Sequence, residues 1–517
     1  MRTAQHIRLT LGSIVLLTAS ACASLPDDLQ QEYSEAWSQP EDTLLGSIVV
    51  ETAPDQPGLS GVELLAQPDE AFLTRFAIAS LAQQSLDLQY YLWKGDLAGQ
   101  LLAWRALQAA DRGVRVRFLI DDIYHSGRDE VYALLDAHPN FQVRVFNPMA
   151  NRGATRYLNY ALNRKKLNHR MHNKIFLGDN AVAVLGGRNI GNDYFGIDTK
   201  ANFLDLDVLA AGPAASETGA AFDEYWNSIY AVPIGVLYEK PVTAADLAAA
   251  RERLDAAVAR IGELPYTVDL DTPDIETQLR EWSAQLAWVD AHVVVDPLER
   301  FEGQGRSAIV EFGDQRVSSI EKDITVESAY LIPSPEGLEG MKELVDRGVR
   351  VRLLTNSLQS NNHISAHSGY LKYRKAILET GAELYELRPD AALRSSFLAN
   401  EDDDAIPAGI HTKSFIIDED QVLIGSFNFD PRSRDLNSEI GLVVNDSEFA
   451  AEVMVAMEED FRPENSYRLF LDDKGRLRWK LENPDGSVTV YTRDPGAPWW
   501  RRAVARFLSW LPIEQDL

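Results

Sequence analysis

HNKIFLGDNAVAVLGGRN, residues 172–189, has a counterpart in the same chain, HTKSFIIDEDQVLIGSFN at residues 411–428. Each copy predicts a β-hairpin, because two β-rich runs flank a turn at Gly-Asp-Asn or Asp-Glu-Asp. Five positions match at a constant offset of 239: His172 with His411, Lys174 with Lys413, Asp179 with Asp418, Gly186 with Gly425, and Asn189 with Asn428. Matches with every spacing preserved indicate that the chain contains an internal duplication.

A second repeat supports the duplication. DRGVRVRFLI at residues 111–120 recurs as DRGVRVRLLT at residues 346–355, with eight of ten positions identical. In both copies a helical pattern ends at a glycine and an alternating Val/Arg run predicts a strand. Upstream, Tyr91 and Tyr330 each end a β-rich run. Helices that alternate with strands predict an α/β fold with a mostly parallel sheet, present twice.

Length and charge limit the classes of function. A chain of 517 residues predicts two halves, each with its own core. The net charge of −28 argues against a nucleic-acid partner, because phosphate backbones are bound mainly by clustered Lys and Arg. Residues 149–178 are the exception, with no acidic residue and seven basic ones. Such a run is either a solvated face or a site for an anionic substrate, and its position before the first motif favours the substrate. The seven are Arg152, Arg156, Arg164, Lys165, Lys166, Arg170 and Lys174.

The paired residues suit phosphodiester chemistry that needs no metal or cofactor. Alternate residues of a strand share a face, so His172 and Lys174 project together, as do their counterparts. One imidazole can attack phosphorus to form a phosphohistidine, while the other donates a proton to the leaving alcohol. The two lysines, with Asn189 and Asn428, would hold the non-bridging oxygens in the transition state.

Acidic residues divide into two groups. Asp179 and Asp418 fall at the turns, where Asp commonly bonds backbone, so we expect them to be more structural than chemical. Each imidazole also needs an acceptor for its second nitrogen. The candidates are Glu439 in NSEIGLVV and Asp207 in FLDLDVLAAG, two runs that predict strands downstream of their motifs, and Asp205 competes with Asp207.

The doubled H-x-K-x₄-D-x₆-G-[GS]-x-N pattern resembles the phospholipase D superfamily. Further segments resemble its bacterial cardiolipin synthase C-type branch: GGRNIGNDYFG at 186–196, FLDLDVLAAGP at 203–213, GYLKYRKAILETGAELYEL at 369–387 and LPIE at 511–514. The resemblance implies two α/β/α halves related by a pseudo-twofold axis, with the active site at their interface. It also implies that His172 is the nucleophile and His411 the acid and base.

Two substrate-binding features depend on the same resemblance. Gly187 occupies the position of Ser426, where serine is commoner in the superfamily, so a phosphate contact from that hydroxyl would be one-sided. His367 either lines the cleft or has a packing role.

The function implied is an enzyme, a phosphatidyltransferase that makes cardiolipin from phosphatidylglycerol and a second phospholipid such as phosphatidylethanolamine. A hydrolytic phospholipase D would use the same chemistry with water as acceptor. A nuclease-like phosphodiesterase is disfavoured by the acidity of the chain, and a non-enzymatic lipid-binding scaffold by the two intact motifs.

Both termini predict an association with the membrane. Residues 1–22 have a basic start, a short apolar run and small residues before Cys22, a secretory pattern. Cys22 after TASA resembles a lipobox with Ala19 where Leu is usual, and the alternative is plain export with cleavage near Ala21 or Ala23. We therefore expect an exported protein, lipid-anchored through Cys22 on the periplasmic side of a membrane.

Near the C-terminus, PWWRRAVARFLSWLP at residues 498–512 sets apolar residues on one helical stripe and arginines mainly on the other. This pattern suits a helix that lies on anionic lipid, or a helix docked on the protein's own core.

The predicted organisation is as follows: 1–22 signal segment, 40–245 first half with its motif at 166–193, 246–300 helical linker, 301–465 second half with its motif at 406–433, and 466–517 C-terminal extension with the amphipathic helix.

Overall fold

A computed structural model of the chain describes residues 31–511 apart from 126, 154–155, 392–407 and 484. The predicted signal segment and Cys22 therefore lie outside the described residues, as does the end of the LPIE segment. Among the helices of the described part, none is long and apolar enough to cross a membrane.

The first half is an α/β unit with three parallel strands. They are β2 (Ser85–Tyr90), β3 (Arg115–Asp121) and β4 (Phe141–Phe146), connected by α4 (Leu97–Asp111) and α5 (Asp129–Asp136). The first motif forms the hairpin of β5 (Ile175–Gly178) and β6 (Val182–Gly186), which lies antiparallel to β2 and is followed by β8 (Asp207–Ala211). Helix α3 (Pro68–Leu81) precedes β2, and α8 (Pro213–Trp226) follows β8.

The second half repeats this connectivity. Its parallel strands are β11 (Asp323–Ser328), β12 (Arg350–Asn356) and β13 (Glu383–Leu387), with α12 (Ala308–Val317) before β11 and α13 (Pro335–Asp346) after it. The second motif forms β15 (Lys413–Ile417) and β16 (Gln421–Gly425), followed by β17 (Ile440–Asn445) and α17 (Ser447–Phe461). The duplicated α/β architecture predicted from the repeats is confirmed.

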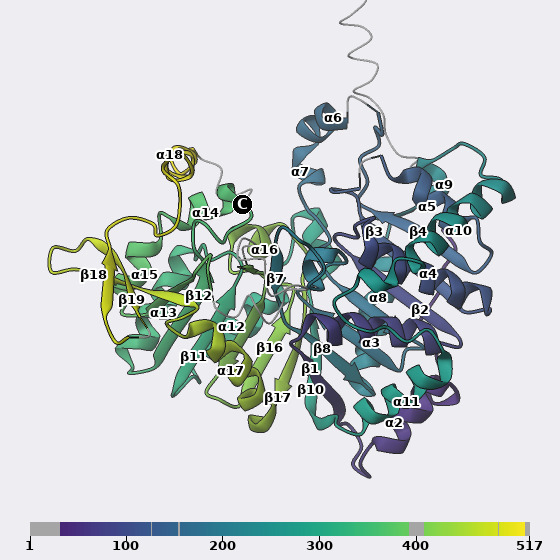
Figure 1. Cartoon of the computed structure of the whole chain (residues 1–517), viewed down its shortest axis with the longest axis horizontal. Helices are drawn as coiled ribbons and strands as arrows, with labels where there is room; N and C mark the ends of the chain where they lie inside the picture. The colour runs from purple at the N-terminus through teal and green to yellow at the C-terminus, as the bar shows by residue number, and fades with distance from the viewer. Residues whose placement is uncertain (1–30, 126, 154–155, 392–407, 484, 512–517) are drawn as a thin grey trace, which may run out of the picture.

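One sheet of 18 strands joins the halves. At its centre β1 (Ser60–Leu65) pairs antiparallel with β10 (Ala287–Val295), and outward from them β1 pairs with β8 and β10 with β17. The order of the strands is therefore the same in both directions from this pair, which places the pseudo-twofold axis between β1 and β10 (Figure 1). The outermost strands are β9 (Ala231–Pro233) on one side, and β18 (Ser466–Leu471), β19 (Leu477–Glu482) and β20 (Val488–Tyr491) on the other.

Segment 246–300 is not simply a helical linker. Helices α10 (Ala244–Val258) and α11 (Thr272–Ser283) pack on α4 and α3 of the first half, whereas residues 287–295 form the central strand β10. The run AWVDAHVVV pairs with strands of both halves, so its backbone hydrogen bonds are satisfied only in the assembled sheet.

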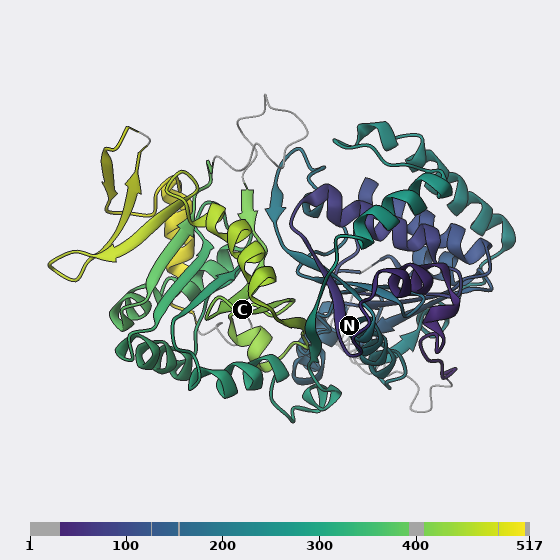
Figure 2. The same cartoon turned by 90° about the horizontal axis from the view of Figure 1, so that it is seen from below.

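A shared core holds the halves together. One apolar cluster contains Ile175 and Leu185 of the first hairpin, Ile424 of the second, and residues of both α8 and α17. Figure 2 shows the two halves side by side, from purple to teal and from green to yellow. Because the cluster crosses the boundary, separating the halves would expose it to water, and the interface is therefore a fixed part of the fold.

Candidate active site

The two hairpins present their histidines at the same edge of the sheet. His172 lies three residues before Ile175, the first residue of β5, and Ile175 pairs with Gln89 near the carboxyl end of β2. At the opposite end of each hairpin the turn residues have a left-handed backbone, with φ of 52° at Asp179 and 53° at Asp418. The histidine and the aspartate of one motif thus lie at opposite ends of a strand.

The two turn aspartates accept hydrogen bonds from backbone N–H groups. Asp179 accepts the N–H groups of Gln83, Gln84 and Ser85 at 2.7–3.1 Å. Asp418 accepts the equivalent groups of Glu321, Lys322 and Asp323 at 2.7–3.2 Å. Each carboxylate therefore fastens its hairpin turn to the start of β2 or β11, in agreement with the structural role expected for both.

Each histidine segment pairs with a segment of the other half. The strand β14 (Ala408–Ile410), just before His411, lies parallel to β7 (Asn202–Leu204), and the His411 N–H donates to the Leu204 carbonyl at 2.7 Å. Likewise the His172 N–H donates to the Ser438 carbonyl at 2.9 Å. This exchange brings each histidine beside the residues that precede β8 or β17 in the opposite half.

The orienting carboxylates are consequently crossed between the halves. His172 Nδ1 lies 2.8 Å from Glu439 Oε2, and His411 Nδ1 lies 2.6 Å from Asp205 Oδ2. All four side chains are buried. Sequence reasoning found Glu439 but placed Asp207 ahead of Asp205, and that preference was wrong.

Asp207 forms ion pairs with two buried arginines instead of orienting a histidine. Its carboxylate lies 2.7 Å from Arg75 and 3.4 Å from Arg188, and all three residues are buried. In the β6–β8 ladder Asp207 is opposite Gly186, whereas in the second half Gly441 is opposite Gly425. Asp205 and Glu439 each stand two residues earlier. Aligning the two strands on the glycines of their motifs would have matched these carboxylates.

The lysines are buried beside the histidines. The Lys174 ammonium donates to the His172 carbonyl, and the Lys413 ammonium lies 2.9 Å from His411 Nδ1. Burial lowers the pKa of Lys174 to about 7 and that of Lys413 to about 8. An anionic group placed between the two ammonium groups would restore the charge that burial disfavours.

Burial also keeps both imidazoles neutral. It lowers the pKa of His172 well below the ordinary value, and the charges of Lys174 and Lys413 act in the same direction. The pKa of His411 falls to about 3 for the same reasons, although Asp205 opposes the shift. In the neutral ring only one nitrogen carries a proton. Because Nδ1 of each histidine donates its proton to a carboxylate, the lone pair of each ring resides on Nε2.

Aromatic rings pack on both imidazoles. Tyr91 contacts His172 edge-on with ring centroids 4.8 Å apart, and Tyr194 contacts His411 in the same way at 5.1 Å. The matched Tyr330 contacts His363 instead, at 6.1 Å. Tyr194 was missed because it does not occur in the duplicated pattern. These contacts restrict rotation of the two imidazole rings, which the hydrogen bonds to Glu439 and Asp205 already orient.

Residues 77–226 and 315–461 match the family described as cardiolipin synthase, PLD-like domain. The chain belongs to the phospholipase D superfamily. It is an enzyme of the cardiolipin synthase branch, as its similarity to cardiolipin synthase C of Escherichia coli indicates, with 34% identity over 91% of this chain and 99% of that protein. Cardiolipin synthase A of Pseudomonas aeruginosa is 24% identical over 77% of this chain and 66% of its own length.

A solved structure supports the fold. The phosphatidylserine synthase of Haemophilus influenzae superposes with a TM-score of 0.57 at 12% identity, over 92% of this chain and all of that one.

The motif asparagines of this phospholipase D-like site differ from each other. The amide of Asn189 is used internally, since its oxygen accepts the Leu92 N–H at 3.2 Å and its nitrogen donates to the Tyr194 hydroxyl at 3.0 Å. The Asn428 oxygen is buried with no hydrogen-bond partner among the described residues. The two amides were expected to act alike on phosphate, but Asn189 instead holds Tyr194, the ring that packs on His411.

Gly187 and Ser426 differ for a structural reason. The Ser426 hydroxyl donates to Glu439, the carboxylate that orients His172. A Cβ at Gly187 would lie 2.1 Å from Asp205 Oδ1, so the carboxylate of Asp205 occupies the space that a serine side chain would need. The serine hydroxyl thus contacts the histidine's partner rather than facing the site directly.

Two other predicted features are mainly structural. His367 is buried, with Nε2 2.7 Å from Arg374 and its ring against Tyr370, which agrees with the packing alternative. Three arginines of the basic run form ion pairs with Asp121 or Asp122 at the end of β3: Arg152, Arg156 and Arg170. Their acidic partners lie outside the run and were therefore not visible in its local composition.

Proposed function

We propose that the enzyme is a phosphatidyltransferase that forms cardiolipin from phosphatidylglycerol and a second phospholipid. The observation that carries the proposal is the pair of buried histidine–carboxylate contacts, each built from both halves of the chain. Two neutral imidazoles whose lone pairs reside on Nε2, together with two buried ammonium groups, suit a phosphodiester substrate. Relatives named cardiolipin synthase make phospholipids the natural substrate class.

In the first step, His172 Nε2 attacks phosphorus of the donor lipid and the bond to the leaving alcohol breaks. His411 protonates that alcohol at its oxygen. Because His411 is neutral in the free site, it takes up this proton when the anionic phosphodiester binds beside it and raises its pKa. Lys174 and Lys413 neutralise the charge that develops on the non-bridging oxygens.

In the second step, the hydroxyl of the acceptor lipid attacks the phosphohistidine. His411 removes the proton of that hydroxyl, and His172 leaves as a neutral imidazole. With phosphatidylglycerol as acceptor the product is cardiolipin, and with water it is phosphatidic acid. The chemistry is the same in both cases, so exclusion of water at this step decides between transferase and hydrolase.

We also propose that helix α18 (Trp499–Leu508) contacts the membrane. The helix docks through Ala505, which is fully buried, and through Arg501, which donates to the Leu358 carbonyl. Its other face and the turn that follows it expose five large apolar residues, among them Trp499 at 75% on the helix and Trp510 at 78% in the turn. The two predicted alternatives are therefore compatible, since a docked helix can still present an interfacial face.

The position of α18 supports this orientation. The helix packs on α14 (Ile364–Tyr370), which follows the carboxyl end of β12, and α7 (Arg164–Leu167) follows the carboxyl end of β4. Both sites lie on the edge that carries the histidines, and α18 and α7 stand on the same upper side in Figure 1. Lys165 and Lys166 of α7 are exposed and suit anionic lipid. An acylated Cys22 would add an anchor on the periplasmic side.

The test is to incubate purified protein with vesicles of phosphatidylglycerol, with and without labelled phosphatidylethanolamine, and to identify the lipid products by mass spectrometry. Cardiolipin as the main product supports the proposal, and label from phosphatidylethanolamine in cardiolipin would identify the second donor. Phosphatidic acid alone would indicate a hydrolytic phospholipase D. Cleavage of DNA without lipid turnover would contradict the proposal. His172→Ala controls for contaminating enzymes.

A further inference from the structure

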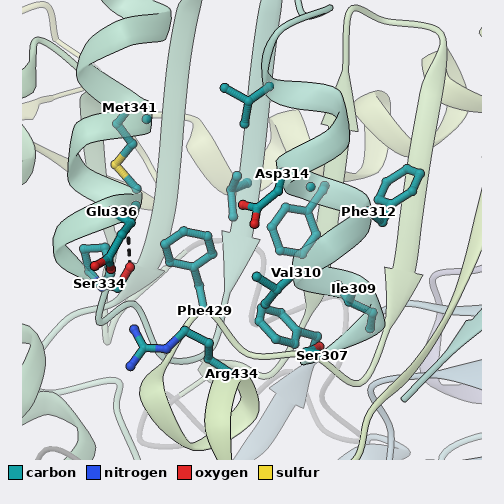
Figure 3. A pocket seen from close by; sticks show the side chains of 18 of the residues that line it. Ser307, Ile309, Val310, Phe312, Asp314, Ser334, Glu336, Met341, Phe429 and Arg434 are labelled. Atoms are coloured by element: carbon teal, nitrogen blue, oxygen red, sulfur yellow. Dashed lines mark hydrogen bonds between the residues drawn. The ribbon is translucent and has the colours of Figure 1, made fainter. Parts of the chain in front are cut away.

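The second half contains a cavity of about 830 Å³ that the catalytic chemistry does not use. It has an apolar interior and exposed charged residues at its rim, among them Asp314, Glu336 and Glu339. It lies between α12 and α13, above the face of the sheet formed by β11, β12, β15 and β16 (Figure 3). Its floor consists of aliphatic and aromatic side chains, including Val326, Leu353 and Phe415. The volume falls within the range of sites that bind small molecules, about 300–1,000 Å³.

At the corresponding place in the first half, large side chains pack between the helices and the sheet. There α3 and α4 pack directly on each other, and Phe72, Phe76, Leu101 and Leu102 belong to one continuous core. In the second half the equivalent helices are shorter, at 10 and 12 residues against 14 and 15. Gly313 of α12 and Gly340 of α13 both line the cavity and place no side chain in it. The two halves therefore have the same layer of helices over the sheet, but the space beneath it is packed with side chains in the first half and open in the second.

The cavity divides the core of the second half. Ile309 of α12 belongs to a small cluster with Leu423 and Phe427, whereas Met341 of α13 belongs to a separate cluster with Leu344 and Val326. Phe429 packs on both clusters, is only half-buried, and lies between the two helices in Figure 3. Apolar side chains left partly in contact with water favour an apolar ligand.

The length of α12 and the position of the cavity both point to an acyl chain as the ligand. Ten residues of α12 span about 15 Å, which equals half of the ~30 Å hydrocarbon thickness of a bilayer, the depth of one acyl chain. One end of the cavity is lined by Phe427 and Phe429, which flank Asn428 of the second motif, and the other end by Ile320 and Leu344. A chain lying along the cavity would therefore have its polar end at the edge of the sheet where the histidines stand.

We propose that this cavity binds one fatty acyl chain of a phospholipid substrate while its phosphate occupies the two-histidine site. The proposal rests on the proposed function for the identity of the lipid. The cavity then sets chain-length selectivity, and it extracts one chain of the substrate from the bilayer before the chemistry begins.

Gly340 offers a sharp test. A Cβ at this position meets no atom within 4 Å, so a larger side chain can enter without displacing the fold. Gly340→Leu fills part of the cavity, and Gly340→Ala is the matched control, because it makes the same change in helix propensity without the volume. Gly313, which has the same open surroundings, provides an independent position for the Leu and Ala pair.

The first readout is kinetic. Gly340→Leu should raise KM for long-chain phosphatidylglycerol in mixed micelles about tenfold, the effect of excluding about two methylene groups from an apolar site. It should leave kcat/KM for a water-soluble short-chain phosphatidylglycerol unchanged, and Gly340→Ala should match the wild type with both. Equal KM values for the Leu and Ala variants with the long-chain lipid would overturn the inference.

The second readout does not depend on turnover. Phosphatidylglycerol with a photoreactive group at the end of one acyl chain is irradiated with the intact protein, and the cross-linked peptides are identified by mass spectrometry. Cross-links on α12, α13 or β11 that disappear in Gly340→Leu support the inference, and cross-links confined to α18 overturn it. If the protein labels in the cavity but turns over no phospholipid, the proposed function fails while the binding site stands.

Discussion

His172 Nδ1 lies 2.8 Å from Oε2 of Glu439, a residue 267 positions away in the other half of the chain. The reciprocal contact joins His411 to Asp205 across 206 positions. Neither half can therefore orient its own histidine, and the active site exists only when the halves are assembled. This gives a physical reason for the large shared core between them.

The crossed pairs predict that two conservative substitutions act on different steps. Glu439→Gln should slow formation of the phosphohistidine on His172 by about 10²–10⁴, since an amide holds the wrong tautomer. Asp205→Asn should instead let the intermediate form from a substrate with a good leaving group and then slow its breakdown. Rapid-quench trapping of the phospho-enzyme with labelled lipid separates the two steps. Pairing within each half would give the opposite assignment.

Asp207→Asn should lower stability and leave the chemistry intact. The substitution removes the charge that two buried arginines share, Arg75 and Arg188, at a cost of about 3–5 kcal/mol. Denaturant unfolding measures this loss. At low temperature the folded fraction should keep nearly normal kcat, in contrast to Asp205→Asn. A fully stable Asp207→Asn protein without activity would contradict the roles assigned to these two aspartates.

Asp179→Ala and Asp418→Ala should also be stability variants. Each removes the acceptor of three backbone N–H groups. At Asp179 these groups are largely buried and the loss costs about 2–5 kcal/mol, whereas at Asp418 they are mostly exposed, so water replaces the acceptor and the loss is smaller. Because the turns lie at the far end of the strands from the histidines, the folded variants should still form phosphohistidine. Loss of the intermediate from a protein with an unchanged unfolding midpoint would show that these carboxylates act in the chemistry.

The rate should depend on pH in a bell-shaped manner. On the acid side, burial lowers the pKa of His172 below its ordinary value, so the neutral nucleophile persists and the acid limb of kcat/KM lies below pH 6.5. On the basic side, Lys174 and Lys413, with pKa values of about 7 and 8, lose their charge and the rate falls. Lys174→Arg keeps its charge and should move the basic limb upward.

Chelation provides the control for this profile. The proposed steps use only imidazole and ammonium groups, so activity should survive dialysis against EDTA across the whole pH range. A strict requirement for a divalent metal would contradict the two-histidine mechanism.

The exposed face of α18 should determine vesicle binding. Replacing Trp499, Phe507 and Trp510 by Ser should weaken sedimentation with phosphatidylglycerol vesicles by about tenfold or more, because these side chains are 59–78% exposed and carry most of the apolar face. Cleavage of a soluble diester should not change. Val455→Ser is the matched control, since Val455 is 74% exposed on α17 away from this helix. Equal binding by all the proteins would exclude α18 as the membrane contact.

The sequence alone was sufficient to predict the motif residues and the duplicated architecture of this protein. The hairpins and the turn role of Asp179 follow from patterns within some twenty residues, because hairpins and turns are decided by local alternation and backbone geometry. The motif residues and the duplicated α/β halves follow from matches between segments 235–239 residues apart. The charge composition likewise argues against a general nucleic-acid binder.

Tertiary structure decided which residues meet. Asp205 rather than Asp207 orients a histidine because strand register places Asp207 opposite Gly186, against Arg75. Contacts between segments that are separate in the sequence decide three further features. These are the crossed histidine–carboxylate pairs, the ion pairs between the basic run and Asp121 or Asp122, and the cavity beneath α12. Local periodicity cannot encode such contacts, since they arise only when the strands have assembled into one sheet and the helices have packed on it.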